Sequence, residues 1–206
     1  SLGNVNVGAI DEYKNVKERF EFMSTQKSDL EKSRDDLNKV IKSMQELMEE
    51  RFESRFAEIN KSFSAVFKEL FGGGSGKLSL SEPDNVLESG IEIEVQLPGK
   101  SLQNINLYSG GEKSFIAIAL LFAILQVKPT PFCILDEIDA ALDDVNVSRF
   151  ATYINNNLSE SQFIVITHRR GTMEAASTLY GVTMQEKGVT KMLRLAIDEV
   201  DENLIK

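Results

Sequence analysis

The sequence has few residues of the kinds that build disulfide frameworks, metal clusters or membrane spans. Its 206 residues include one cysteine and one histidine. Cys133 lies inside the apolar run 132–135, so a disulfide framework and a thiolate metal site are excluded and a reducing, intracellular setting is expected. No run reaches the roughly 18 to 20 apolar residues of a membrane span, and residues 1–4 (SLGN) lack the features of a signal peptide. We therefore expect a soluble protein with no membrane partner.

Basic charge is also scarce. The chain has 23 Lys and Arg residues against 32 Asp and Glu residues, a net charge of -9. Because phosphate binding needs clustered Lys and Arg, we expect no dominant nucleic-acid surface, and any DNA contact is local or supplied by another segment. With 42% hydrophobic residues, the chain can bury one core and carry an appendage.

The first part of the chain has the pattern of a long helix. From Val16 to Met48, ten positions spaced alternately four and three apart include eight apolar residues, with no Pro or Gly between them, which indicates a heptad seam. Beyond Met48 the spacing changes and the apolar face widens as far as Leu70, which suits docking on a globular body. The stripe has no second helix here to receive it, so we expect its partner to come from elsewhere. An independent helical bundle is the alternative.

The rest of the chain predicts an α/β fold. Apolar and polar residues alternate from Ile91 to Leu97, which indicates a half-exposed antiparallel strand paired with residues 77–81. An apolar helix over 112–127 and a helix from about 145 to 158 then alternate with two buried strands, 132–135 and 163–166. A hairpin of 182–185 and 189–195 closes the chain. This order is typical of an α/β sheet core.

Residues 72–77 (GGGSGK) resemble a phosphate-binding P-loop but do not meet its requirements. That motif has four residues between its first Gly and the Gly-Lys pair, then Ser or Thr, and it joins a strand to a helix. Here the spacer is too short, Leu78 follows the lysine, and a helix precedes while a strand follows. We interpret the run as a flexible turn and predict that this chain carries no P-loop.

Residues 109–113 (SGGEK) introduce the apolar helix and allow two interpretations. Ser109 with Glu112 forms a capping box, which needs no ligand. Alternatively, Gly110 and Gly111 expose backbone N–H groups at a helix N-terminus, where the helix dipole favours an anionic phosphate. The motif by itself does not decide between them, but its neighbours favour the phosphate.

Two strand ends carry the remaining polar residues of interest. Asp136 and Glu137 follow the strand 132–135, at the end where α/β sheets place ligands. In phosphoryl transfer such an Asp holds Mg²⁺ and a second group orients or deprotonates the attacking water, whereas capping of the next helix is the structural alternative. His168 follows the run 163–167 and could sense a terminal phosphate, although alone it would be taken for an exposed loop residue. The turn at 109–111 and these two strand ends together predict a nucleotide site.

These residues resemble the ABC-type ATPases and, among them, the bacterial SMC (structural maintenance of chromosomes) family. The matching segments are the signature motif at 107–113 (LYSGGEK), Walker B at 133–137 (CILDE), the D-loop at 140–143 (AALD) and the His switch at 167–173 (THRRGTM). Glu112 stands where membrane transporters of the superfamily usually have Gln. Tyr108, where Leu is usual, and residues 114–116 (SFI) depart from the family pattern.

The resemblance implies a fold and a set of site residues. Residues 59–206 would be the carboxy-terminal lobe of an ABC-type α/β ATPase head with antiparallel strands, and residues 1–58 the carboxy-terminal end of a coiled-coil arm. The ligands would be ATP and Mg²⁺. The implied roles are catalysis by Glu137 and His168, Mg²⁺ binding by Asp136, a grip on the γ-phosphate of ATP on the opposing head by Ser109, Gly110 and Gly111, and monitoring of the interface by Asp143.

The resemblance also implies partners and a function. An amino-terminal half would carry the P-loop, a second SMC head would complete a homodimer, and a kleisin subunit and DNA would bind the assembly in the cytoplasm, associated with the nucleoid. The expected function is an ATPase for chromosome condensation and segregation, with this chain alone inactive. An SMC-like DNA-repair ATPase is the nearest alternative. Glu112 and the heptad helix oppose a transporter subunit, and the strand-end acids and histidine oppose a nonenzymatic scaffold.

Overall fold

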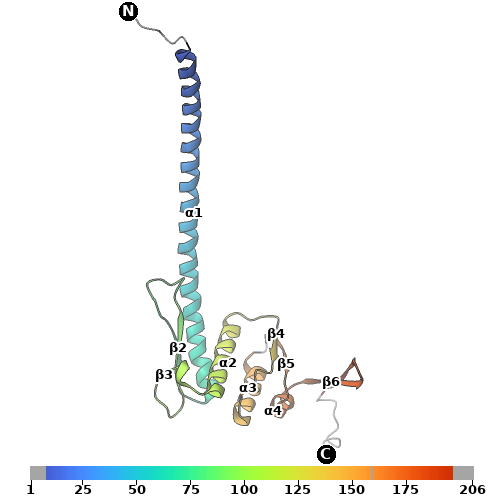
Figure 1. Cartoon of the computed structure of the whole chain (residues 1–206). Coiled ribbons are helices and arrows are strands. Elements are labelled where there is room, and N and C mark those ends of the chain that lie inside the picture. The colour runs from blue at the N-terminus through green and yellow to red at the C-terminus, as the bar shows by residue number, and fades with distance from the viewer. Residues whose placement is uncertain (1–7, 159, 197–206) are drawn as a thin grey trace, which may run out of the picture. The chain divides into compact units, whose positions relative to one another are not determined.

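The computed structural model describes residues 8–158 and 160–196. The chain forms two compact units, residues 1–52 and 53–206, and helix α1 (Ala9–Phe71) runs through both (Figure 1). This division falls before the predicted boundary at residues 58 and 59. Each unit is described separately below.

The first unit consists of the predicted heptad helix. Its exposed faces carry helical ion pairs such as Lys17 with Glu21 and Lys27 with Glu31, a spacing that supports helices. The heptad stripe itself is exposed along its length: Val16, Phe20, Met23, Leu30, Leu37, Ile41, Met44 and Met48. The long helix is therefore confirmed, and nothing in the described part of this unit covers the stripe.

The second unit begins with the apolar end of α1, which packs on a small sheet. The helix buries an aromatic row that includes Phe63 and Phe67. The sheet contains β1 (Ser75–Leu80), β2 (Ile91–Gln96) and β3 (Gln103–Asn104), all antiparallel. The predicted pairing of the first two strands is confirmed. The short strand β3 and the 3-10 turn η1 (Ile105–Leu107) that follows it were not predicted.

The glycine-rich run after α1 forms the turn into β1. Gly72, Gly73 and Gly74 all have positive φ, a conformation that favours glycine. A Cβ on Gly74 would lie 2.1 Å from the backbone oxygen of Gln96, so no larger residue fits there. The turn interpretation is confirmed for residues 72–74, whereas residues 75–77 of the same run belong to β1.

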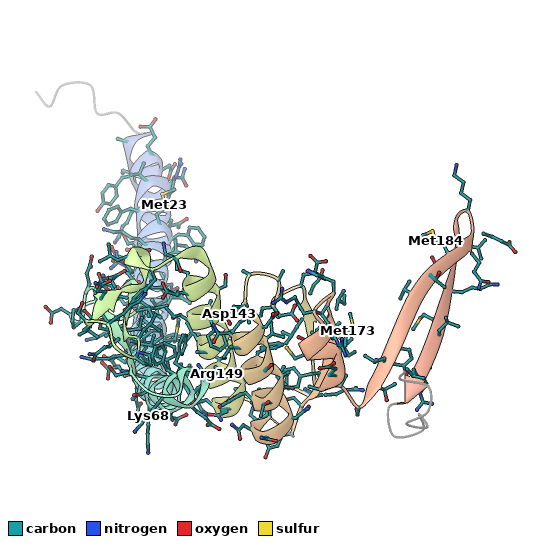
Figure 2. All side chains as sticks on the ribbon, turned by 90° about the horizontal axis from the view of Figure 1, so that it is seen from below. Met23, Lys68, Asp143, Arg149, Met173 and Met184 are labelled. Atoms are coloured by element: carbon teal, nitrogen blue, oxygen red, sulfur yellow. The ribbon has the colours of Figure 1, made fainter. Side chains whose placement is uncertain are left out.

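Helices α2 (Gly110–Val127) and α3 (Asp144–Asn157) contribute much of the core of the second unit. Phe122 of α2 is fully buried and stacks on Phe150 and Tyr153 of α3, with ring centroids 5.7 and 5.2 Å away. Arg149 of α3 donates a hydrogen bond of 3.2 Å to the carbonyl of Phe71, which satisfies a free acceptor at the end of α1 (Figure 2). Both predicted helices are confirmed.

Strands β4 (Phe132–Asp136) and β5 (Gln162–Ile166) form a parallel pair joined through α3. The sequence predicted two buried strands, and that prediction is wrong for one face. Cys133, Leu135, Phe163 and Val165 pack toward the core, whereas the alternate residues Phe132, Ile134, Ile164 and Ile166 are exposed. Parallel strands are normally covered on both faces. Here the described chain covers only one.

The described chain ends with a short helix and a hairpin. Helix α4 (Arg170–Glu174), which was not predicted, leads to β6 (Thr178–Glu186) and β7 (Val189–Ala196). The predicted hairpin is confirmed and is longer than expected. Its apolar side chains, such as that of Met184, are exposed (Figure 2).

Helix α2 is the one helix among the described residues with the length and hydropathy of a membrane span. Its buried side chains are those expected of a core helix: Phe115, Ile116, Ile118, Ala119, Phe122, Ala123 and Leu125. These side chains belong to the core of the second unit.

Two phenylalanines provide a test of where the core lies. Replacing the buried Phe122 with Ala should lower the free energy of unfolding by about 3–5 kcal/mol, because it empties the space between three rings. Phe132, which is 58% exposed on the open face of β4, is the matched control, and Phe132→Ala should change stability by less than about 0.5 kcal/mol. Urea unfolding followed by circular dichroism measures both, and equal losses would contradict this core assignment.

Candidate functional site

The pairing of β4 with β5 brings the predicted acids and histidine to one edge of the sheet. Asp136 lies opposite Ile166 in the parallel register, and the Glu137 N–H donates a hydrogen bond of 2.9 Å to the Ile166 carbonyl. His168 comes two residues after Ile166. All three side chains are exposed, so a ligand can reach this edge. The structure therefore places the strand ends that carry Asp136, Glu137 and His168 next to each other at one edge of the sheet.

Glu137 has an unusual backbone conformation. Its φ is 48°, the only positive φ among the described residues other than glycine. A side chain in this left-handed region costs about 1–2 kcal/mol, and such strain gathers at functional sites. The backbone turns at this residue as soon as the strand pairing ends. This strain was not predicted.

Asp143 lies at the N-terminus of α3, where its Oδ1 accepts a hydrogen bond of 2.8 Å from the backbone N–H of Asn146 (Figure 2). This is an N-cap, a role that stabilises a helix without any ligand. Its side chain is exposed, so it can also meet another molecule.

The turn at 109–111 forms the N-terminus of α2, and Glu112 organises it. The Glu112 carboxylate accepts hydrogen bonds from the Ser109 backbone N–H (3.2 Å) and from the Ser109 hydroxyl (2.9 Å). The Glu112 arm of the predicted capping box is thus present. Ser109 is exposed and is not buried beside Glu137.

The two glycines of this turn differ in their surroundings. A Cβ on Gly111 would lie 2.9 Å from the carbonyl oxygen of Ala141, so Gly111 is required by packing against the loop 140–143. A Cβ on Gly110 would meet nothing within 4 Å, and its φ is not positive. Packing therefore explains why position 111 is glycine, but it does not explain the glycine at position 110.

Lys100 contacts this end of α2, and this contact was not predicted. Its Nζ lies 2.6 Å from Glu112 Oε1 and 5.6 Å from the centre of the Tyr108 ring. The Tyr108 hydroxyl donates to the carbonyl of Val95 at 2.8 Å, so the unusual tyrosine is anchored to β2. The hydrogen bond from Lys100 lowers the pKa of the Glu112 carboxyl, and those from Ser109 lower it further against the opposing effect of burial.

No group of three or more metal-ligating side chains occurs in residues 8–158 and 160–196. A protein site for Mg²⁺ often supplies only one or two carboxylates, with the other ligands coming from phosphates and water. Asp136, an exposed carboxylate at a strand end, fits that kind of site.

Comparison with known proteins identifies the family of this chain. Residues 14–191 match the RecF/RecN/SMC N terminal domain family. The chain belongs to the RecF/RecN/SMC family. It is 54% identical over 201 residues to the chromosome partition protein Smc of Bacillus subtilis, covering 98% of this chain and 17% of that protein. The chain thus spans about one-sixth of the length of this curated relative.

Solved SMC structures share the α/β fold of this chain. One, from work on the ATP-driven dimerisation and DNA-stimulated activation of SMC ATPases, is 42% identical with a TM-score of 0.67, and the match covers 73% of this chain and 91% of that one. Another is an Smc head bound to the C-winged helix domain of ScpA, 44% identical with a TM-score of 0.67, covering 71% of this chain and 45% of that one.

Alanine substitutions test whether Gly110 and Gly111, the two glycines of the turn at 109–111, differ in their packing. Gly110→Ala should leave stability unchanged or raise it by up to about 1 kcal/mol, because the backbone is compatible and the space is open. Gly111→Ala should be less stable than Gly110→Ala by about 1–3 kcal/mol, because the new methyl group meets the Ala141 carbonyl. Thermal unfolding of the two variants decides the question, and equal midpoints would contradict the packing of α2 on the 140–143 loop.

The Glu112 contacts predict a pH-dependent stability. Because the folded-state pKa of Glu112 is lowered, its contribution is present above the ordinary glutamate pKa of about 4.3 and is lost as the pH falls through the lower folded-state value. Wild-type protein should therefore unfold at a higher temperature than Glu112→Gln at pH 7, and the difference should vanish near pH 3. Glu186→Gln, at an exposed hairpin residue, is the control. A difference that stays constant with pH would contradict the ion pair.

Proposed function

We propose that this chain is the carboxy-terminal half of an SMC ATPase head and that it works with an amino-terminal half that carries the P-loop. The one glycine-rich run ending in Gly-Lys is a turn from a helix into a strand, which is the wrong order for a phosphate cradle. The apolar face of β4 and β5 is uncovered in the described chain, which is the condition expected if another segment completes the sheet.

The observation that carries the proposed activity is the shared edge of β4 and β5. Asp136 would hold the Mg²⁺ of bound ATP, and the ion would neutralise charge on the phosphates. Glu137 would orient or deprotonate the attacking water, and its left-handed backbone turns it away from the strand direction. His168 would hydrogen-bond the terminal phosphate from the neighbouring strand end.

The turn at 109–111, called the signature turn because it lies in the signature motif, would bind a second nucleotide, held by an opposing head. Ser109 and Gly110 are exposed at the N-terminus of α2, and Gly110 has no packing reason to be glycine. Gly111 would add its backbone N–H while it packs on the D-loop. Asp143, at the end of that same loop, would then monitor the interface between heads. ATP would join two heads into a homodimer, and hydrolysis would release them.

We further propose that the complete protein tethers DNA in chromosome condensation and segregation, in the cytoplasm and associated with the nucleoid. The curated relative is a chromosome partition protein, which favours this role over DNA repair. The head bound to a ScpA domain supports a kleisin partner, and the work on DNA-stimulated SMC ATPases supports a DNA partner. Because the proposed site needs two further protein segments, this chain alone should not hydrolyse ATP.

The role of Glu137 can be tested in the full-length protein. Glu137→Gln should lower the ATPase rate by about 10²–10⁴-fold, since a general base is lost, while ATP still joins the heads. Light scattering with ATP should therefore show a persistent head dimer. Glu160→Gln, at an exposed residue before β5, should behave as wild type. A Glu137→Gln protein that stays monomeric in ATP would contradict the assigned role.

A further inference from the structure

Asp139 is a buried acid that the proposed catalytic steps do not use. Its exposed fraction is 0%, and it is the one charged residue in the core formed by the described residues. Its position, two residues after Glu137, lies between β4 and α3. Burying a carboxylate without a cation is unfavourable, and an apolar side chain of similar size would serve packing as well or better. The contacts of this carboxylate should therefore show what it does.

Both contacts of Asp139 reach the segment that carries His168. The Thr167 hydroxyl donates a hydrogen bond of 2.7 Å to Asp139 Oδ2, and the Thr172 hydroxyl donates to the same oxygen. The other oxygen, Oδ1, has no hydrogen-bond partner among the described residues. Thr167 directly precedes His168, and Thr172 lies in α4 just beyond it. One carboxylate oxygen therefore holds the chain on both sides of the histidine.

Arg169 makes further hydrogen bonds between the His168 segment and the loop after β4. Its backbone N–H donates to the Thr167 hydroxyl oxygen at 2.9 Å. Its guanidinium donates to the Leu142 carbonyl at 2.9 Å and to Asp144 Oδ1 at 2.8 Å. Both neighbours of His168 are thus tied to the loop 139–144, which includes Asp143, while the imidazole itself is exposed.

We propose that Asp139 is a positioning residue for His168. Through Thr167 and Thr172 it fixes the histidine segment to the loop that carries Asp143, so that a displacement of this loop moves the imidazole. This inference rests on the proposed function for the role of His168 in hydrolysis. The physical link itself is a property of this chain alone. If a second head contacts and displaces this loop, the displacement moves the His168 imidazole at the end of β5.

The link can be tested without any activity, because His168 is the only histidine. Its imidazole gives a single Cε1–H signal in a ¹H–¹³C NMR spectrum of this chain. Thr167→Val, which keeps the shape and removes the hydroxyl, should shift or broaden that signal. Thr167→Ser, which keeps the hydroxyl, should not. Thr152→Val, at an exposed threonine of α3, is the matched control.

Two further variants test the Asp139 carboxylate and its second hydrogen-bond donor, the Thr172 hydroxyl. Asp139→Asn keeps an oxygen that can accept both hydroxyl hydrogen bonds and should leave the His168 signal near its wild-type position. Thr172→Val removes the other donor and should shift the signal in the way that Thr167→Val does. An unchanged His168 signal in both valine variants, with each shown to be folded by circular dichroism, would overturn the proposal.

Kinetics of the full-length protein test whether the contacts of Asp139 affect ATP hydrolysis. Thr167→Val should lower kcat by about 10- to 100-fold with little change in KM, as expected when a reacting group is misplaced. In a His168→Ala background the same change should have almost no further effect, because both act through one imidazole. Full effects in both backgrounds would overturn the proposal. If His168→Ala has no effect on hydrolysis, the proposed function of His168 is wrong, and the NMR comparison still decides whether Asp139 positions it.

Discussion

The parallel pairing of β4 with β5 is the interaction on which the candidate site depends. Its register places Asp136 opposite Ile166, and the hydrogen bond from the Glu137 N–H to the Ile166 carbonyl ends the ladder at that point. The chain must turn there, and it does so through the left-handed backbone of Glu137. A slip of one residue would send these side chains to the opposite face of the sheet. The acids and His168 share an edge only because this register holds.

Two apolar surfaces of the described chain are uncovered. One face of the strand pair is apolar and uncovered in the described structure, and the heptad stripe of α1 is uncovered as well. The turn at 109–111 belongs to a separate helix end, where a Cβ on Gly111 would meet the carbonyl oxygen of Ala141. The loop that contains Ala141 also contains the buried Asp139, which accepts a hydrogen bond from Thr167 next to His168. These contacts connect the turn, the loop after β4 and the segment after β5.

Much of this could be predicted from the sequence where periodicity was strong. The heptads of α1 and the alternation in β2 predicted the element types because each pattern has a single period, and the apolar runs of β4 and β5 predicted strands because they are short. Local patterns carry no signal for long-range contacts, so the pairing of Asp139 with Thr167, the Lys100–Glu112 ion pair and the strain at Glu137 were missed. The exposure of Ile134 was missed for another reason. Its apolar character fits a covered strand, and the described chain does not supply the cover.

The measurement that tests the account most directly mixes two full-length variants. One carries Ser109→Arg, which damages the signature turn and leaves Glu137 intact, and the other carries Glu137→Gln with an intact turn. If these residues act on different nucleotides, a mixed dimer retains one complete site, and the mixture should hydrolyse ATP faster than either variant alone. A mixture as inactive as its two components would show that both residues serve the same nucleotide, which would contradict the account.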